Sequence, residues 1–158
     1  MTLDISMNIF KGHIPAEIGA FLPVLTILNI FRNALEGNIP SSVGDMNLLI
    51  KHLAKSCIFL QLLVLSNNSL HGQIFSSANF NLSSLNSLQL DGNNFSGKIP
   101  DSLSNTFLYG LYLSDNKLSS KIPGWLGNMT TSVELAMPNN YLEGPIPPEF
   151  CHLKILTF

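Results

Sequence analysis

The sequence predicts a solenoid, a right-handed superhelix of stacked units whose short parallel strands line a concave face. Three observations predict it. A phrase of the form L-x-L-x-x-N-x-L/F-x-G-x-I-P recurs along the chain, for example over residues 28–40 and 88–100. The asparagines of successive copies lie 25, 35, 25, 23 and 24 residues apart. The L-x-L step alternates with period two, which places both leucines on one face of a strand.

Each unit is expected to bury its apolar face only against its neighbours. The L-x-L strands should pair into one parallel sheet, with irregular or 3-10 segments on the convex side and little α-helix. The predicted strands cover residues 3–5, 28–30, 63–65, 88–90, 111–113 and 135–137.

The asparagine of each phrase follows the strand, where the chain must turn. An inward-pointing amide can donate to and accept from the backbone of adjacent turns, so that no buried polar group is left unpaired. We therefore predict a ladder of asparagines that joins unit to unit. Its members are Asn8, Asn33, Asn68, Asn93, Asn116 and Asn140.

Two further marks follow each asparagine. Glycine stands four positions later in five units, and Ser120 takes that place in the sixth. Glycine permits a positive φ or a close backbone approach. Ile-Pro then predicts an extended segment, because proline fixes its own φ and biases the preceding residue away from the helix.

The phrases over residues 118–128 (LSSKIPGWLGN) and 141–151 (YLEGPIPPEFC) resemble those of plant extracellular leucine-rich-repeat proteins. These are the receptor-like proteins and the ectodomains of their kinase relatives. The resemblance covers residues 1–158 apart from an irregular unit near 45–56. It implies an extra short strand at the G-x-I-P element and a location on the extracellular side of the plasma membrane. It also implies recognition of a peptide, protein or microbial ligand in defence or development, with a co-receptor kinase as partner.

The organisation predicted is one leucine-rich-repeat domain over residues 1–158, with about six repeats and a truncated seventh from Leu153. Neither end shows the polar capping unit that repeat proteins usually carry. The chain enters directly on a repeat strand, without a signal-peptide pattern. We therefore expect an interior part of a larger receptor, in which any membrane contact runs through parent segments.

The 35-residue spacing between Asn33 and Asn68 falls about 13–15 residues short of two units at this chain's period. Our hypothesis is an internal deletion or a mis-spliced gene model, not a functional insertion. Residues 46–50 should then form an irregular rung of the sheet without an asparagine of its own. The ladder should consequently break between Asn33 and Asn68.

Composition argues against several function classes. The net charge is −2 and only 11% of residues are charged, which does not favour nucleic acid or an anionic membrane as a partner. The four histidines lack metal-ligand spacing, and no phosphate loop or nucleophile elbow occurs. We expect no catalytic residues, metal or cofactor. Cys57 and Cys151 should be buried, and should lie too far apart for a disulfide.

Four N-x-S/T sequons mark candidate glycosylation sites in a secreted context. They begin at Asn67, Asn81, Asn94 and Asn128.

Specificity should reside on the concave face, at the strand positions beside the two leucines and just after them. Exposed apolar, aromatic and charged groups there indicate contact with a partner. The candidate ligand-binding residues are Phe31, Arg32, Val64, Gln89, Asp91, Tyr112, Asp115 and Glu134. Other concave positions include Ser66, Ser114 and Asn139.

Two alternatives to a receptor module stay open. One is a secreted inhibitor resembling plant polygalacturonase inhibitors, which share the G-x-I-P repeat. The other is a truncated gene product without a function of its own.

Overall fold

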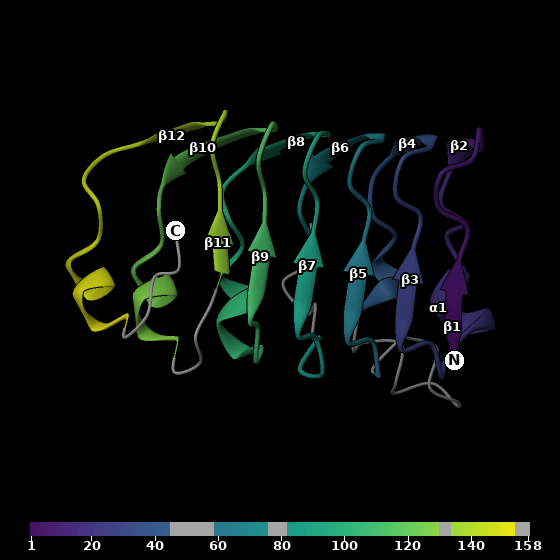
Figure 1. The fold of residues 1–158 in the computed structure, drawn as a ribbon, viewed down its shortest axis with the longest axis horizontal. Coiled ribbons are helices and arrows are strands. Elements are labelled where there is room, and N and C mark those ends of the chain that lie inside the picture. The colour runs from purple at the N-terminus through teal and green to yellow at the C-terminus, as the bar shows by residue number, and fades with distance from the viewer. Residues whose placement is uncertain (45–58, 76–81, 130–133, 154–158) are drawn as a thin grey trace.

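In the computed structural model, the described residues are 1–44, 59–75, 82–129 and 134–153. A six-stranded parallel sheet runs along the solenoid in the order β1-β3-β5-β7-β9-β11 (Figure 1). Its strands are β1 Thr2–Asp4, β3 Ile27–Asn29, β5 Leu62–Val64, β7 Ser87–Gln89, β9 Gly110–Tyr112 and β11 Glu134–Ala136. All six predicted strands are confirmed, each beginning one residue earlier than predicted.

A second six-stranded parallel sheet has the order β12-β10-β8-β6-β4-β2. Its strands are β2 Lys11–His13, β4 Ala34–Gly37, β6 Ser69–Gln73, β8 Asn94–Gly97, β10 Lys117–Lys121 and β12 Tyr141–Glu143. This sheet confirms the extra strand that the family resemblance implies. These strands lie at the L-x-G part of the phrase, and each ends before the isoleucine that follows.

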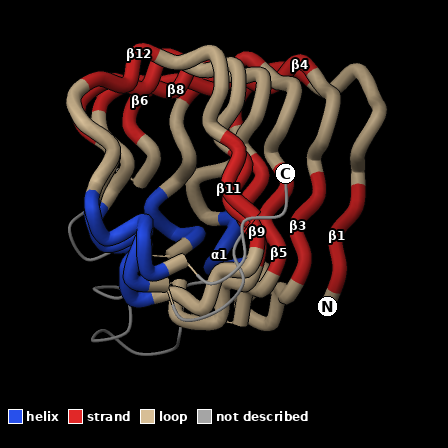
Figure 2. Tube along the Cα trace, turned by 60° about the vertical axis from the view of Figure 1, so that its left-hand side comes forward, coloured by secondary structure: helices blue, strands red, loops and turns tan. Residues whose placement is uncertain are grey.

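Short helices form the third side of the coil, away from both sheets (Figure 2). They are α1 Ile18–Phe21, η1 Ser41–Val43, η3 Asp101–Asn105, η4 Gly124–Asn128 and η5 Pro148–His152. Pro40, Pro100 and Pro123 each precede a 3-10 helix with φ between −74° and −62° and ψ between 135° and 141°. The predicted extended Ile-Pro segment is confirmed, and α-helix is confined to the four residues of α1 in the described part of the chain.

One continuous core fills the space between the three sides. The central leucine of each inner strand from β3 to β9 is at most 1% exposed. The second strand adds a buried apolar residue to each layer, such as Phe95 in β8. Burying each such side chain contributes about 1.5–3 kcal/mol, so every unit depends on its neighbours to cover its face.

The asparagine ladder is confirmed from Asn33 to Asn140, whereas Asn8 is exposed and bonds only within its own unit. Asn93 and Asn116 are 8% and 6% exposed. Asn93 Nδ2 donates to the carbonyl of Leu65 in the preceding unit at 3.0 Å and to that of Leu90 in its own unit at 3.0 Å. Asn93 Oδ1 accepts from the Leu70 amide of the preceding unit at 3.0 Å. One amide therefore pairs backbone groups of two units and fixes their register.

The predicted break in the ladder is wrong. Asn68 Nδ2 donates to the Ile30 carbonyl at 3.0 Å, and Asn68 Oδ1 accepts from the Leu35 amide at 3.1 Å. Strand β3 pairs directly with β5, Leu28 opposite Leu63, so no irregular rung separates them. The ladder and both sheets pair only the strand–turn–strand part of a unit, and that part is complete on either side.

In the sequence, the extra length of this unit lies between η1 and β5. Residues 44–61 stand between η1 and β5, whereas residues 106–109 suffice between η3 and β9. The segment 45–56, to which the deletion hypothesis refers, lies within residues 45–58, outside the described residues.

A left-handed turn precedes every ladder asparagine, and the sequence did not reveal it. The residues at this position have φ between 53° and 63°, although most are not glycine. They are Met7, Arg32, Asn67, Gly92, Asp115 and Asn139. This turn redirects the chain at the strand end, so that the next side chain points inward. The feature is hidden in the sequence because these residues share no type.

A second set of left-handed residues occupies the predicted glycine positions. Ser120, which stands at one of these positions, has φ 84°. In the folded state, a left-handed residue with a Cβ costs about 1–2 kcal/mol, whereas glycine costs about 0.5–1 kcal/mol through the backbone entropy that it loses on folding.

We expect Ser120→Gly to raise the free energy of unfolding by about 0.5–1 kcal/mol in a urea titration. Ser119→Gly is the control, because Ser119 is equally exposed in the same strand without a positive φ and should lose stability. A loss of stability in Ser120→Gly would contradict the strain argument.

The ladder makes a second prediction. Asn93→Ala leaves the Leu70 amide unpaired in the core, at about 1–3 kcal/mol. It also removes one of two donors from each of the Leu65 and Leu90 carbonyls, which keep the side-chain amides of Asn68 and Asn116. The free energy of unfolding should therefore fall by about 2–4 kcal/mol. Asn8→Ala is the matched control, because Asn8 is exposed and donates only to Ile5 and Ser6 of its own unit. It should cost about 1 kcal/mol or less. Similar losses in the two variants would show that inter-unit bonding adds nothing.

Candidate functional site

The concave sheet presents a regular grid of side chains to solvent. In each strand the residues beside the central leucine point away from the core, because side chains alternate along a strand. The strands pair in exact register, so that Val64, Gln89 and Tyr112 form one row across β5, β7 and β9. Neighbouring strands lie about 4.8 Å apart, which lets side chains of adjacent units touch.

Tyr112 and Glu134 form the strongest polar contact on this surface. The Tyr112 hydroxyl donates to Glu134 Oε2 at 2.5 Å. This hydrogen bond, with partial burial and the nearby negative charges of Glu134 and Asp91, raises the pKa of Tyr112 to about 12. The phenol therefore stays protonated, and its ring is held in place across two units.

The absence of a side chain at Gly110 makes room for the Tyr112 ring. A Cβ at position 110 would lie 2.8 Å from Tyr112 Cε2 and 3.1 Å from Ser87 Oγ, closer than packed atoms allow. The edge of the Tyr112 ring therefore lies against the backbone of its own strand at Gly110.

Asp91 is also held by two neighbouring units. Its Oδ2 accepts from Ser66 Oγ at 3.2 Å in the preceding unit, and its Oδ1 accepts from the Ser114 amide at 3.0 Å in the following unit. A carboxylate with two fixed donors keeps its orientation, so Asp91 presents its charge at a defined place beside Tyr112.

Two more carboxylates are bridged to the next unit. Asp115 Oδ1 accepts from Asn139 Nδ2 at 2.6 Å. Asp4 Oδ2 accepts from Asn29 Nδ2 at 2.9 Å, and hydrogen bonds from Ser6 and Asn29 hold the pKa of Asp4 below its usual value. Side-chain bridges of this kind therefore recur along the concave face at intervals of one unit.

The structure brings part of the predicted site together. Asp91, Tyr112 and Glu134 form one group over β7, β9 and β11, which we call the acidic–aromatic group. Asp115 lies in the turn after β9 and is bonded to Asn139. Gln89 lies in register between Val64 and Tyr112 and is half-buried.

The remaining predicted residues lie apart from that group. Arg32 is exposed in the left-handed turn after β3, and the half-buried Phe31 precedes it. The expectation that Val64 is exposed is wrong, because it is 8% exposed between the neighbouring strands. Whether any of these residues binds a ligand stays a prediction.

The sequence did not single out the residues that hold the site. Ser66, Ser114 and Asn139 were placed on the concave face, but their bonds to the aspartates were not foreseen. The available signal was the spacing, since Asp91 and Ser114 are 23 residues apart and Asp115 and Asn139 are 24 apart, one unit in each case. Tyr109, 56% exposed just before β9, was missed as a second tyrosine near Tyr112.

The sequon asparagines that the structure describes lie on different faces of the coil. Asn67 is exposed in the turn after β5, on the concave side. Asn94 begins β8 in the second sheet and is half-buried. Asn128 ends η4 on the convex side and is exposed, and Asn81 lies outside the described residues. A glycan on Asn67 would compete with any ligand of the concave face.

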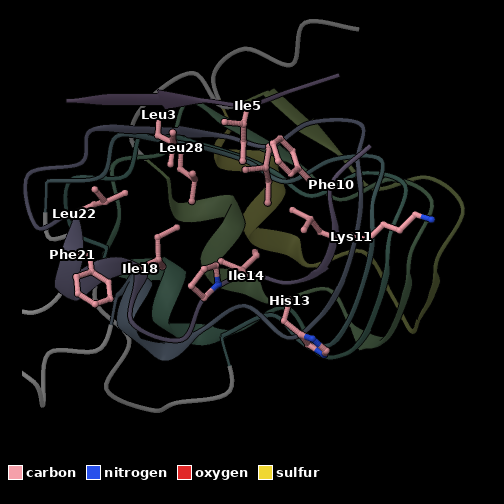
Figure 3. Close-up of a pocket in the computed structure, with 13 residues that line it drawn as sticks. Leu3, Ile5, Phe10, Lys11, His13, Ile14, Ile18, Phe21, Leu22 and Leu28 are labelled. Atoms are coloured by element: carbon pink, nitrogen blue, oxygen red, sulfur yellow. The ribbon is translucent and has the colours of Figure 1, made fainter. Parts of the chain in front are cut away.

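A large apolar hollow lies at the β1–β2 end of the coil (Figure 3). It encloses about 410 Å³ and is lined by side chains such as Leu3, Ile5, Ile14, Leu22 and Leu28. These occupy the repeat positions that pack between units elsewhere in the chain. The hollow is therefore the stacking face of the first unit, and it offers few polar groups to orient a ligand.

The other predicted features concern cysteine, metal and membrane. Cys151 is exposed, so the expectation that it is buried is wrong, and Cys57 lies outside the described residues. Within the described ranges, no three His, Cys or acidic residues cluster closely enough to hold a metal ion. No helix there has the length and apolar character needed to cross a membrane.

Comparison with known proteins agrees with this architecture. The Leucine Rich Repeat family model matches residues 84–106 and 107–129. Receptor-like protein 9a of Arabidopsis thaliana is 33% identical over 139 residues, which cover 79% of this chain and 15% of that protein. Receptor-like protein 53 of the same plant is 42% identical over 160 residues, covering 98% of this chain and 15% of that protein.

The chain is built from leucine-rich repeats of the plant receptor type. It spans about 15% of the length of these curated relatives. The Arabidopsis receptor kinase HAESA, solved with the peptide hormone IDA and the co-receptor SERK1, aligns with a TM-score of 0.78 and 32% identity over 97% of this chain and 24% of that one. The PEPR1–AtPEP1 structure aligns with a TM-score of 0.78 and 31% identity over 96% of this chain and 19% of that one.

The Tyr112–Glu134 bond can be tested by titration. Because the pKa of Tyr112 is raised above its usual value near 10, the bond stabilises the leucine-rich-repeat fold at neutral pH. This contribution is lost as the pH rises towards about 12. We expect Glu134→Gln to lower the Tyr112 pKa towards 10, as followed by phenolate absorbance. Subtracting the titration of Tyr112→Phe isolates the signal.

Glu36→Gln serves as the control, since Glu36 lies on β4 in the second sheet. An unchanged Tyr112 titration in Glu134→Gln would show that the hydrogen bond does not set the pKa.

Proposed function

We propose that this chain is a non-catalytic recognition module of a plant cell-surface receptor. Its concave sheet binds an extended peptide or protein segment on the extracellular side of the plasma membrane, and a co-receptor kinase joins the complex. The observation that carries this proposal is the acidic–aromatic group, whose side chains are fixed by neighbouring units before a ligand arrives. Preorganisation of this kind lowers the entropic cost of binding.

The charges on the concave face support a ligand with cationic side chains. Of the described residues there, Asp4, Asp91, Asp115 and Glu134 carry negative charge, and Arg32 is the one cation. The described lysines lie instead on or beside the second sheet, at Lys11, Lys98, Lys117 and Lys121. Opposite charges on ligand and site favour association and fix the orientation of the bound segment.

The relatives support the same role. The HAESA and PEPR1 structures contain a peptide hormone and AtPEP1 respectively, and HAESA also contains a co-receptor. The similarity covers almost all of this chain, including its concave sheet. Defence or developmental signalling belongs to this proposal as the role of the parent receptor.

The test uses the full chain and a library of immobilised synthetic peptides matched in length but differing in charge. We expect retention of peptides rich in Lys or Arg that contain an aromatic residue. Tyr112→Ala or Asp91→Ala should weaken binding about tenfold or more, as expected for a central contact of more than 1 kcal/mol. Binding would be followed by biolayer interferometry.

Lys117→Ala and Ser96→Ala are the controls, because both residues are exposed on the second sheet. They should leave peptide binding unchanged. Peptide binding that is insensitive to the concave variants would contradict the proposal. Inhibition of a polygalacturonase by the chain would support the inhibitor alternative instead.

A further inference from the structure

A second hollow lies on the convex side, separate from the proposed recognition surface on the concave sheet. It encloses about 300 Å³ between two successive units. The ends of η3 and η4 and the residues after them form its walls, including Ser104, Asn105, Phe107, Trp125, Asn128 and Met129. These short helices lie on the side of the coil away from the strands (Figure 2).

The lining combines aromatic surfaces with amide and hydroxyl groups. Trp125 and Phe107 contribute aromatic rings, and Phe107 is 69% exposed. Ser104 and Asn105 add polar side chains to the lining. A sugar ring presents apolar C–H faces together with hydroxyl and acetamido groups, so this mixture matches a sugar better than a purely apolar ligand.

Trp125 contributes its ring to the hollow, not its indole N–H. The Nε1 atom is buried, so an acceptor placed in the hollow does not reach it. The indole instead lies near the Asp101 carboxylate, which Lys98 Nζ bonds at 2.6 Å. Lys98 is the main cause, and the Trp125 indole a smaller one, of the lowered pKa of Asp101. The contact that Trp125 offers a ligand is therefore apolar packing against its ring.

Asn128 links the hollow to a modification. It is the exposed last residue of η4, it lines the hollow, and it begins the sequon Asn128-Met129-Thr130. Asn67 and Asn94 lie on the concave side and in the second sheet, away from it. A sugar attached to Asn128 Nδ2 therefore begins at the rim of the hollow.

We propose that Asn128 carries an N-linked glycan whose first N-acetylglucosamine seats in this hollow against Trp125 and Phe107. The bond forms between Asn128 Nδ2 and C1 of the sugar as the C1–O bond to a lipid diphosphate donor breaks. The amide nitrogen loses one proton to solvent, and the lipid diphosphate leaves. The covalent tether holds the sugar at an effective concentration of about millimolar, so a shallow seat suffices.

This inference rests on the extracellular location within the proposed function, because N-linked glycans are added in the secretory pathway. The test uses the full chain behind a secretion signal in cells that attach high-mannose glycans. Mass spectrometry of the peptide that contains Asn128 gives its occupancy. Trp125 is the sole tryptophan of the chain, so intrinsic fluorescence reports this hollow alone.

Three forms are compared: intact, trimmed to one N-acetylglucosamine by endoglycosidase H, and unglycosylated Thr130→Ala. We expect the intact and trimmed forms to share one emission spectrum. Thr130→Ala should be red-shifted and roughly twofold more accessible to iodide quenching, because the seated sugar covers the ring. Thr130→Ser keeps the sequon and should behave as the unchanged chain, while Asn67→Gln should leave the fluorescence unaltered.

Equal fluorescence in all three forms, or an unoccupied Asn128 in the secreted chain, would overturn this inference without affecting the proposed peptide site on the concave sheet.

A second measurement does not depend on secretion. Diacetylchitobiose should shift the Trp125 emission of the unglycosylated chain to shorter wavelength. The sugar is used at tens of millimolar, above the effective concentration of about millimolar that the tether provides. Maltose should not shift the emission, and equal effects of the two sugars would also count against the seat.

Discussion

The structure depends on one constraint: each turn of the coil leaves backbone groups that only the next turn can pair. The ladder asparagines meet it by joining the carbonyls and amides of two units through a single amide, as Asn93 does with Leu65 and Leu70. Because the bonds are buried, losing one costs far more than making it gains. Register, strand pairing and core stacking all follow from this arrangement.

This constraint also decides where the repeat tolerates variation. The strand–turn–strand part is fixed by the ladder and by both sheets, so it keeps its length in every unit. The connection from a convex helix to the next inner strand differs in length, with residues 44–61 between η1 and β5 and residues 106–109 between η3 and β9. Loop-closure entropy grows slowly with length, so extra residues in this connection cost little stability.

The same regularity prepares the concave face for recognition. Strands in exact register bring side chains of adjacent units within bonding distance, and this fixes Asp91, Tyr112 and Asp115 through partners one unit away. A surface whose side chains are already ordered loses little freedom on binding. The fold thus supplies rigidity, and the few variable positions supply chemistry.

The sequence by itself determined the repeat, the strands and the inward asparagines, because each depends on local spacing that recurs from unit to unit. Only the tertiary structure decided which units are neighbours. It placed β3 against β5 and closed the ladder across Asn33 and Asn68, where counting residues had suggested a gap. It also buried Val64, exposed Cys151 and joined Tyr112 to Glu134. These outcomes depend on contacts between residues distant in the chain, and a repeat pattern specifies the positions of such residues but not how their side chains pack.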